Sequence, residues 1–280
     1  MRFENQINDS IDRRNPGEHP VIVEMHPKAV EVLKDDAIDP KHFYEHFGQE
    51  AVEKDKTYIE RLKAKFENDE SKKAAEVLEA IIYLHSELSE WLGPNVETIR
   101  PTEYDDIVNK VDLIAEFNSE NSPKHLALGV DVTFGSNSLM DKINGIKNEI
   151  DRDELAKVKY FESHGFIGSL RQVPRVVVGV EKDTVIELAG LWMRKENKQL
   201  GDHPARNIIM TQIIEQLTTF RNYAEHHGKV GALKSYNQAL ETLKPLQAEL
   251  KALDKVRREF IQTDKVYQSI HNEISFKFSK

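Results

Sequence analysis

The chain has 280 residues, no cysteine, 39% hydrophobic and 31% charged side chains, and a formal net charge of −9. This length is enough to bury a full hydrophobic core in one large domain or in two smaller ones. The absence of cysteine excludes disulfides, thiolate metal sites and a cysteine nucleophile. No apolar run approaches the roughly 20 residues of a membrane-spanning helix, and the first residues show no apolar signal segment. A cytoplasmic protein with no membrane partner is therefore predicted.

The charge is distributed unevenly along the chain. Residues 1–127 hold 16 basic and 28 acidic side chains, a net charge of −12, whereas residues 128–280 hold 23 basic and 20 acidic ones, a net charge of +3. The overall acidity argues against a protein that coats nucleic acid through general attraction to phosphate. If the chain binds phosphate groups, the binding surface is expected in its second half.

The first part of the chain is expected to be helical. Residues 1–19 read as a polar tail, and residues 21–24 as a short edge strand or the lead-in to a helix. Helices are predicted where a proline begins a helical pattern or where apolar residues recur every three or four positions. These helices cover residues 27–35, 40–48, 50–67 and 71–91.

Strands are expected in the middle of the chain, where β-branched and aromatic residues are concentrated between turn residues. They cover residues 111–117, 126–134 and 173–180, whereas residues 97–106 read as irregular chain and a turn. Further helices are predicted at residues 138–150, 183–195 and 205–227, and over the leucine-rich stretch 233–278 with an interruption near Pro245.

An acid stands at the centre of the most strand-like run, residues 126–134. Asp131 lies between Val130 and Val132, and a buried strand rarely carries a carboxylate unless that group is paired or holds a metal. The preceding strand carries Asp112 near its start. Both acids are therefore candidate metal ligands, with a structural role for Asp131 and a turn cap for Asp112 as the alternatives.

The order of the elements resembles the core of the PD-(D/E)xK nuclease superfamily. It runs helix 71–91, strands 111–117 and 126–134, helix 138–150, strand 173–180 and helix 183–195. The resemblance implies an α/β fold with a mixed central sheet flanked by helices, like that of the restriction endonucleases. Here it would be followed by a long helical C-terminal extension. In this superfamily two strand acids hold Mg²⁺ and a lysine two residues after the second acid assists the reaction.

Matching these positions assigns roles to individual residues. Asp112 matches the first strand acid and Asp131 the second. Thr133 stands where the motif has lysine, so the candidate lysine is Lys142 on the following helix, with Lys147 as the second choice. The resemblance implies that Asp112, Asp131 and Lys142 are catalytic.

The helix at 71–91 is expected to contribute a further metal ligand, as the first helix often does in such folds. Glu79 is favoured over Glu76, so the implied ligands of Mg²⁺, or of Mn²⁺ in its place, are Asp112, Asp131 and Glu79. Asp105 and Asp106 are additional candidates with a plainer interpretation as turn residues.

The function that the resemblance implies is Mg²⁺-dependent hydrolysis of DNA phosphodiester bonds, with in-line attack by water and a 5′-phosphate product. The alternative is a catalytically silent nuclease-like fold that serves as a protein- or nucleic-acid-interaction module. Thr133, the acidic charge and the long C-terminal helices favour this alternative. A purely structural helical protein is a third possibility.

Three parts are expected along the chain. Residues 1–70 would form an N-terminal helical region, residues 71–200 the nuclease-like α/β core, and residues 201–280 a helical hairpin packed on the core. DNA is the expected partner of an active enzyme, and the C-terminal helices are the expected contact for a homodimer or a protein partner.

Overall fold

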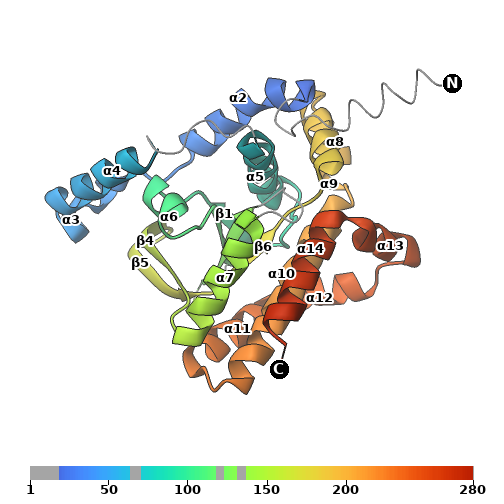
Figure 1. Cartoon of the computed structure of the whole chain (residues 1–280). Coiled ribbons are helices and arrows are strands. Elements are labelled where there is room, and N and C mark those ends of the chain that lie inside the picture. The colour runs from blue at the N-terminus through green and yellow to red at the C-terminus, as the bar shows by residue number, and fades with distance from the viewer. Residues whose placement is uncertain (1–18, 64–70, 118–122, 131–136, 280) are drawn as a thin grey trace.

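A computed structural model of the chain describes residues 19–63, 71–117, 123–130 and 137–279, and in these ranges a small mixed sheet is surrounded by helices (Figure 1). The expected α/β class is therefore confirmed at this level. None of the helices in these ranges is long and apolar enough to cross a membrane.

The central sheet has four strands in the order β1-β2-β3-β6. They are β1 (Val96–Ile99), β2 (Leu113–Phe117), β3 (Lys124–Val130) and β6 (Arg175–Val178). β2 is antiparallel to β1 and to β3, whereas β3 and β6 are parallel. Because Leu113 pairs with Leu128, the beginning of β2 and the end of β3 lie at the same edge of the sheet.

Helices cover the sheet on both sides. The helix α5 (Ser71–Leu88) contacts β1 and β3 and packs against α2 (Pro20–Asp35) and α8 (Lys182–Met193), whereas α7 (Asn137–Arg152) contacts β6 from the other side (Figure 1). The main hydrophobic core combines side chains from α2, from the sheet and from the last helix, among them Ile22, Leu113 and Ile274. The division into three parts stays a prediction.

A second sheet consists of the hairpin β4 (Ala156–Ser163) and β5 (Phe166–Val173). Val158 and Phe161 of this hairpin are buried with Ile114 and Ala127 of the central sheet. Several helices lie beside the hairpin (Figure 1). They are η2 (Pro40–Phe43), α3 (Tyr44–Phe47), α4 (Gln49–Lys63) and α6 (Glu103–Ile107).

Two glutamines cover the outer edge of β6. Gln216 on α10 (Ala205–His226) accepts a hydrogen bond from Val177 N (2.9 Å) and donates one to Val177 O (2.6 Å), and Gln212 makes the same pair of contacts to Gly179 (2.9 and 2.7 Å). Both side chains are fully buried. Spaced one helical turn apart, they satisfy backbone groups that would otherwise be unpaired at a buried strand edge.

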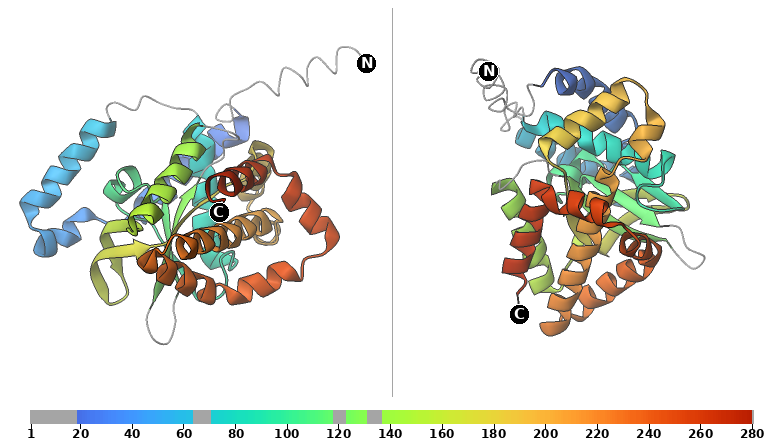
Figure 2. Two further views of the ribbon diagram at one scale, coloured as in Figure 1. Left: turned by 60° about the horizontal axis from the view of Figure 1, so that its bottom comes forward. Right: turned by 90° about the vertical axis from the view of Figure 1, so that its right-hand side faces the viewer.

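The C-terminal helices differ from the expected hairpin. The stretch predicted as interrupted helix 233–278 is divided into four helices, which follow one another around one side of the molecule in orange to red (Figure 2). After α9 (Asn197–Gly201) and α10, they are α11 (Val230–Thr242), α12 (Lys244–Lys251), α13 (Lys255–Thr263) and α14 (Lys265–Lys277). Asp254 and Asp264 begin α13 and α14 as N-caps, each accepting a backbone hydrogen bond.

Two local predictions were wrong, and one strand was not predicted. The helix predicted to begin at Pro27 is α2, which begins at Pro20 and has Pro27 inside it. Residues 21–24 therefore follow the helical one of their two interpretations. The buried stripe from Ile22 to Leu33 stabilises the helix despite the hydrogen bond lost at Pro27. Residues 97–99, which were expected to be irregular, belong to the strand β1, whose conformation depends on pairing with β2. Most of β5 was not expected, because its polar and exposed residues show no clear alternation.

Candidate active site

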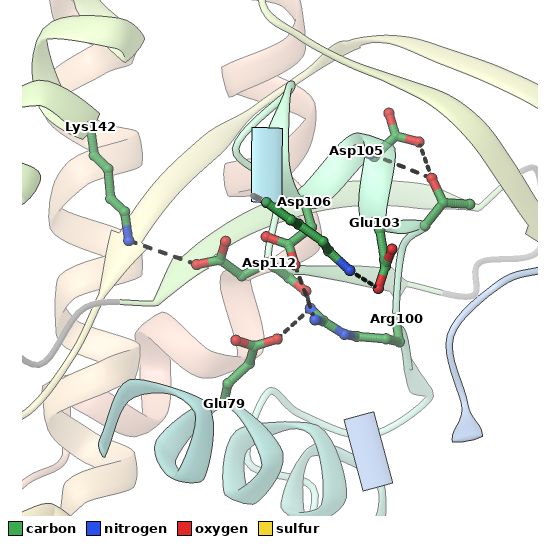
Figure 3. A network of polar contacts seen from close by, with 9 residues as sticks. Glu79, Arg100, Glu103, Asp105, Asp106, Asp112 and Lys142 are labelled. Carbon is green, nitrogen blue, oxygen red and sulfur yellow. Dashed lines mark hydrogen bonds and ion pairs between the residues drawn. The ribbon is translucent and has the colours of Figure 1, made fainter. Parts of the chain in front are cut away.

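Arg100 lies directly after β1, and its carbonyl accepts a hydrogen bond from Ile38 N (3.2 Å). Only 14% of its side chain is exposed. The guanidinium extends toward the edge of the sheet where β2 begins, into a group of carboxylates (Figure 3). This arginine is the centre of the candidate site.

Three segments of the chain contact the Arg100 guanidinium. Glu79 of α5 forms an ion pair with it, and Oδ2 of Asp106 on α6 lies 3.1 Å from Nη2. The main-chain carbonyl of Asp112 accepts a hydrogen bond from Nη1 at 2.5 Å. The guanidinium has five donors in a rigid plane, so it can hold all three groups at once.

The side chain of Asp112 extends in another direction, toward α7 (Figure 3). Its Oδ2 lies 3.8 Å from Nζ of Lys142, and these side chains are 16% and 21% exposed. The aliphatic part of the Lys142 side chain lies close to Gly129 of β3. A Cβ atom added at Gly129 would be 3.9 Å from Lys142 Cδ. We call Glu79, Arg100, Asp106, Asp112 and Lys142 the Arg100 cluster.

The electrostatics of the Arg100 cluster reflect an excess of acid in a poorly solvated place. Burial raises the pKa of Glu79 well above its usual range, with Arg100 acting in the opposite direction. Burial, with the nearby charge of Asp112, raises the pKa of Asp106 to about 6. For Arg100, burial disfavours the charge, but the facing carboxylates outweigh it and raise its pKa.

The structure brings together three of the residues predicted from the sequence. Glu79, Asp112 and Lys142 come from α5, the start of β2 and α7, and all belong to the Arg100 cluster. Asp131, Val132 and Thr133 lie outside the described residues. Asp131 follows Val130, which is the last residue of β3 and pairs with Val178.

The second-choice lysine has other partners. Lys147 Nζ lies 2.7 Å from Oδ2 of Asp151 and 2.6 Å from the hydroxyl of Tyr223 on α10. Hydrogen bonding to Asp151 raises the pKa of Lys147. Although both lysines lie on α7, Lys147 takes part in packing α7 against α10, and Lys142 is the one that approaches Asp112.

The acids ahead of β2 also have distinct roles. Asp105 is fully buried and accepts hydrogen bonds from Lys159 N (2.6 Å) and Tyr160 N (3.0 Å), so it joins α6 to β4. Asp106 instead pairs with Arg100. Sequence reasoning missed Arg100, although it is the only basic residue between Val96 and Ile107.

The donor set of the Arg100 cluster suits a hard divalent cation only in part. No group of three or more acidic or histidine side chains that could hold a metal is found in the part of the chain that the structure describes. Glu79 and Asp106 contact Arg100, whereas the Asp112 carboxylate faces Lys142. Carboxylate oxygen is the donor that Mg²⁺ prefers, so within the Arg100 cluster Asp112, whose carboxylate does not pair with Arg100, is the acid that fits such an ion.

Comparisons with models of protein families, with curated proteins and with solved structures found no match. Function is therefore inferred from the chemistry of the Arg100 cluster and its place in the fold.

Proposed function

We propose that the protein is a Mg²⁺-dependent nuclease that hydrolyses phosphodiester bonds of DNA on a restriction-endonuclease-like core. The observation that carries the proposal is the approach of Lys142 to Asp112, at 3.8 Å, at the edge of the sheet where β2 begins and β3 ends. Both residues were candidates on sequence grounds alone, although they lie on separate elements.

The topology of the central sheet supports this proposal. A helix (α5) precedes three strands that are antiparallel in succession, and a helix (α7) then leads through the β4–β5 hairpin to a strand parallel to β3. This arrangement agrees with the mixed sheet flanked by helices that the superfamily resemblance implies. In the chain, the candidate acid Asp112 directly precedes β2 and Asp131 directly follows β3.

Each residue of the proposed site has a defined task. Asp112 and Asp131 would hold Mg²⁺, which when bound would lower the pKa of the attacking water and neutralise charge on the phosphate. Lys142 would take the place of the lysine missing at Thr133. Its ammonium group, held beside Asp112, would orient the water or stabilise the charge that develops on the phosphate oxygens.

The two lysines of α7 provide a matched test. With purified protein, DNA and Mg²⁺, Lys142→Ala is expected to lower the cleavage rate by about 10²–10³-fold, since it removes a cation aimed at the transition state. Lys147→Ala, on the same helix but paired with Asp151, is expected to retain the wild-type rate. Equal rates in the two variants would contradict the role of Lys142.

The two acids provide the second test. Asp112→Asn and Asp131→Ala are expected to abolish Mg²⁺-dependent cleavage while the circular dichroism spectrum stays that of the folded protein. Asp202→Asn, at an exposed position after α9, is the control and should cleave normally. Cleavage that survives in Asp131→Ala would contradict the role of Asp131. A wild-type protein that does not cleave DNA would favour a catalytically silent interaction module.

A further inference from the structure

The Arg100 guanidinium occupies a position that resembles that of a bound cation. It is contacted by carboxylates from two helices and by a main-chain carbonyl, which are the oxygen groups that also surround hard metal ions. Its own backbone is fixed by Ile38 N, and its side chain is 14% exposed. The positive charge is therefore held in place by the fold.

Glu79 depends on this charge. Its side chain is 9% exposed, and its carboxylate is paired with Arg100. A buried carboxylate that loses its cation must be neutralised by a proton or by another cation, because an isolated buried charge is strongly unfavourable. In the absence of Arg100, Glu79 and Asp106 together would be a carboxylate pair in need of a counterion.

Asp112 belongs to both sides of the site. Its carbonyl contacts Arg100, whereas its carboxylate faces Lys142. Asp112 would hold the ion of the proposed function, whereas a second ion between Glu79 and Asp106 would meet the Arg100 charge at short range. Like charges repel strongly in such a poorly solvated place.

We propose that Arg100 is a built-in cation that takes the place of a second metal ion, so that the protein binds a single divalent ion, at Asp112. This inference rests on the proposed function and makes it more specific. Glu79 and Asp106 pair with Arg100, so Glu79 is not one of the metal ligands, contrary to the expectation from the sequence. Arg100 is a positioning residue that fixes the start of β2 and with it the direction of the Asp112 carboxylate.

The number of bound ions tests this inference directly. Titration of the metal-free protein with Mn²⁺, followed by calorimetry and by the electron paramagnetic resonance of free Mn²⁺, is expected to show one tight site in the wild type. Arg100→Gln is expected to show two, because Glu79 and Asp106 then lack their cation. Arg100→Lys, which keeps a positive charge, is expected to remain at one.

The wild type and a Glu79 variant decide the question even if Arg100→Gln does not fold. Glu79→Gln is expected to bind one Mn²⁺ with an affinity within about threefold of the wild type, because its carboxylate is not a ligand. Two sites in the wild type, one of them lost in Glu79→Gln, would overturn the inference, as would a folded Arg100→Gln that binds one ion.

These outcomes are distinct from a failure of the proposed function. If the wild type binds two ions and cleaves DNA, only the proposal that Arg100 replaces a second metal ion is contradicted. A wild type that binds no divalent ion and does not cleave DNA would remove the nuclease proposal and the inference with it.

Discussion

Two buried arginines adjoin the outer strands of the central sheet, Arg100 after β1 and Arg175 in β6, and their surroundings differ in charge. Arg175, at the start of β6, is 5% exposed and pairs with Glu149 of α7 at 2.7 Å, while its other nitrogen donates to the carbonyl of Lys110 at 3.2 Å. One carboxylate therefore balances one guanidinium. Arg100 faces two carboxylates and lies beside a third acid, Asp112.

The ion pair of Arg175 holds two elements together, whereas the ion pairs of Arg100 lie among several acidic groups. The Arg175–Glu149 pair joins β6 to α7 and leaves no excess charge to bind anything else. In the Arg100 cluster three acids face two basic groups, Arg100 and Lys142, so acids outnumber cations within the cluster. Excess acid, more than burial, distinguishes the candidate active site.

Breaking the balanced pair should have the largest effect on stability. Arg175→Met is expected to lower the free energy of unfolding by about 3–5 kcal/mol, because Glu149 is left as a poorly solvated charge without its partner. Urea denaturation measures this. The double variant Arg175→Met/Glu149→Met should recover most of the loss, and a single variant as stable as the wild type would show that the pair is not structural.

The unbalanced cluster should reveal itself in the pH dependence of stability. The pKa of Asp106 rises from its ordinary 3.8 to about 6 on folding, so the folded protein holds more protons between these values. The contribution of Asp106 to the free energy of unfolding is favourable below pH 4 and is lost as the pH rises through 6. Glu79, whose pKa is also raised, acts in the same direction.

The variant Asp106→Asn is expected to remove part of this dependence. With EDTA present, the stability of the wild type relative to Asp106→Asn should fall by about 1 kcal/mol between pH 4 and pH 7, a modest value because the Asp106 side chain is partly solvated. Urea titrations at several pH values check it. A wild type that instead gains stability over this range would contradict the raised pKa.

An exposed pair beside the cluster should matter least. Lys63 and Glu103 form an ion pair with 48% and 65% of their side chains exposed. Glu103→Ala is expected to change the free energy of unfolding by less than about 1 kcal/mol, because water screens the interaction. A loss as large as that in Arg175→Met would mean that exposure is not what separates these pairs.

The site could be predicted in part from the sequence. Glu79, Asp112 and Lys142 were found because each lies on an element whose type the pattern indicated, in an order that resembles a known core. Arg100 was missed because its importance depends on three segments that are distant in sequence. The glutamines on α10 were missed for the same reason, since an interior glutamine in a helix is indistinguishable from a surface one until a strand edge lies beside it.

The sequence by itself determined the helices with strong apolar periodicity, the strands β2, β3 and β6, and the acids and lysine that adjoin them, because these features are local. The tertiary structure decided that β1 is a strand, that Lys142 and not Lys147 faces Asp112, and that Glu79 pairs with Arg100. Such choices depend on which side chains share a poorly solvated volume, where the energies of charge and desolvation exceed any local preference.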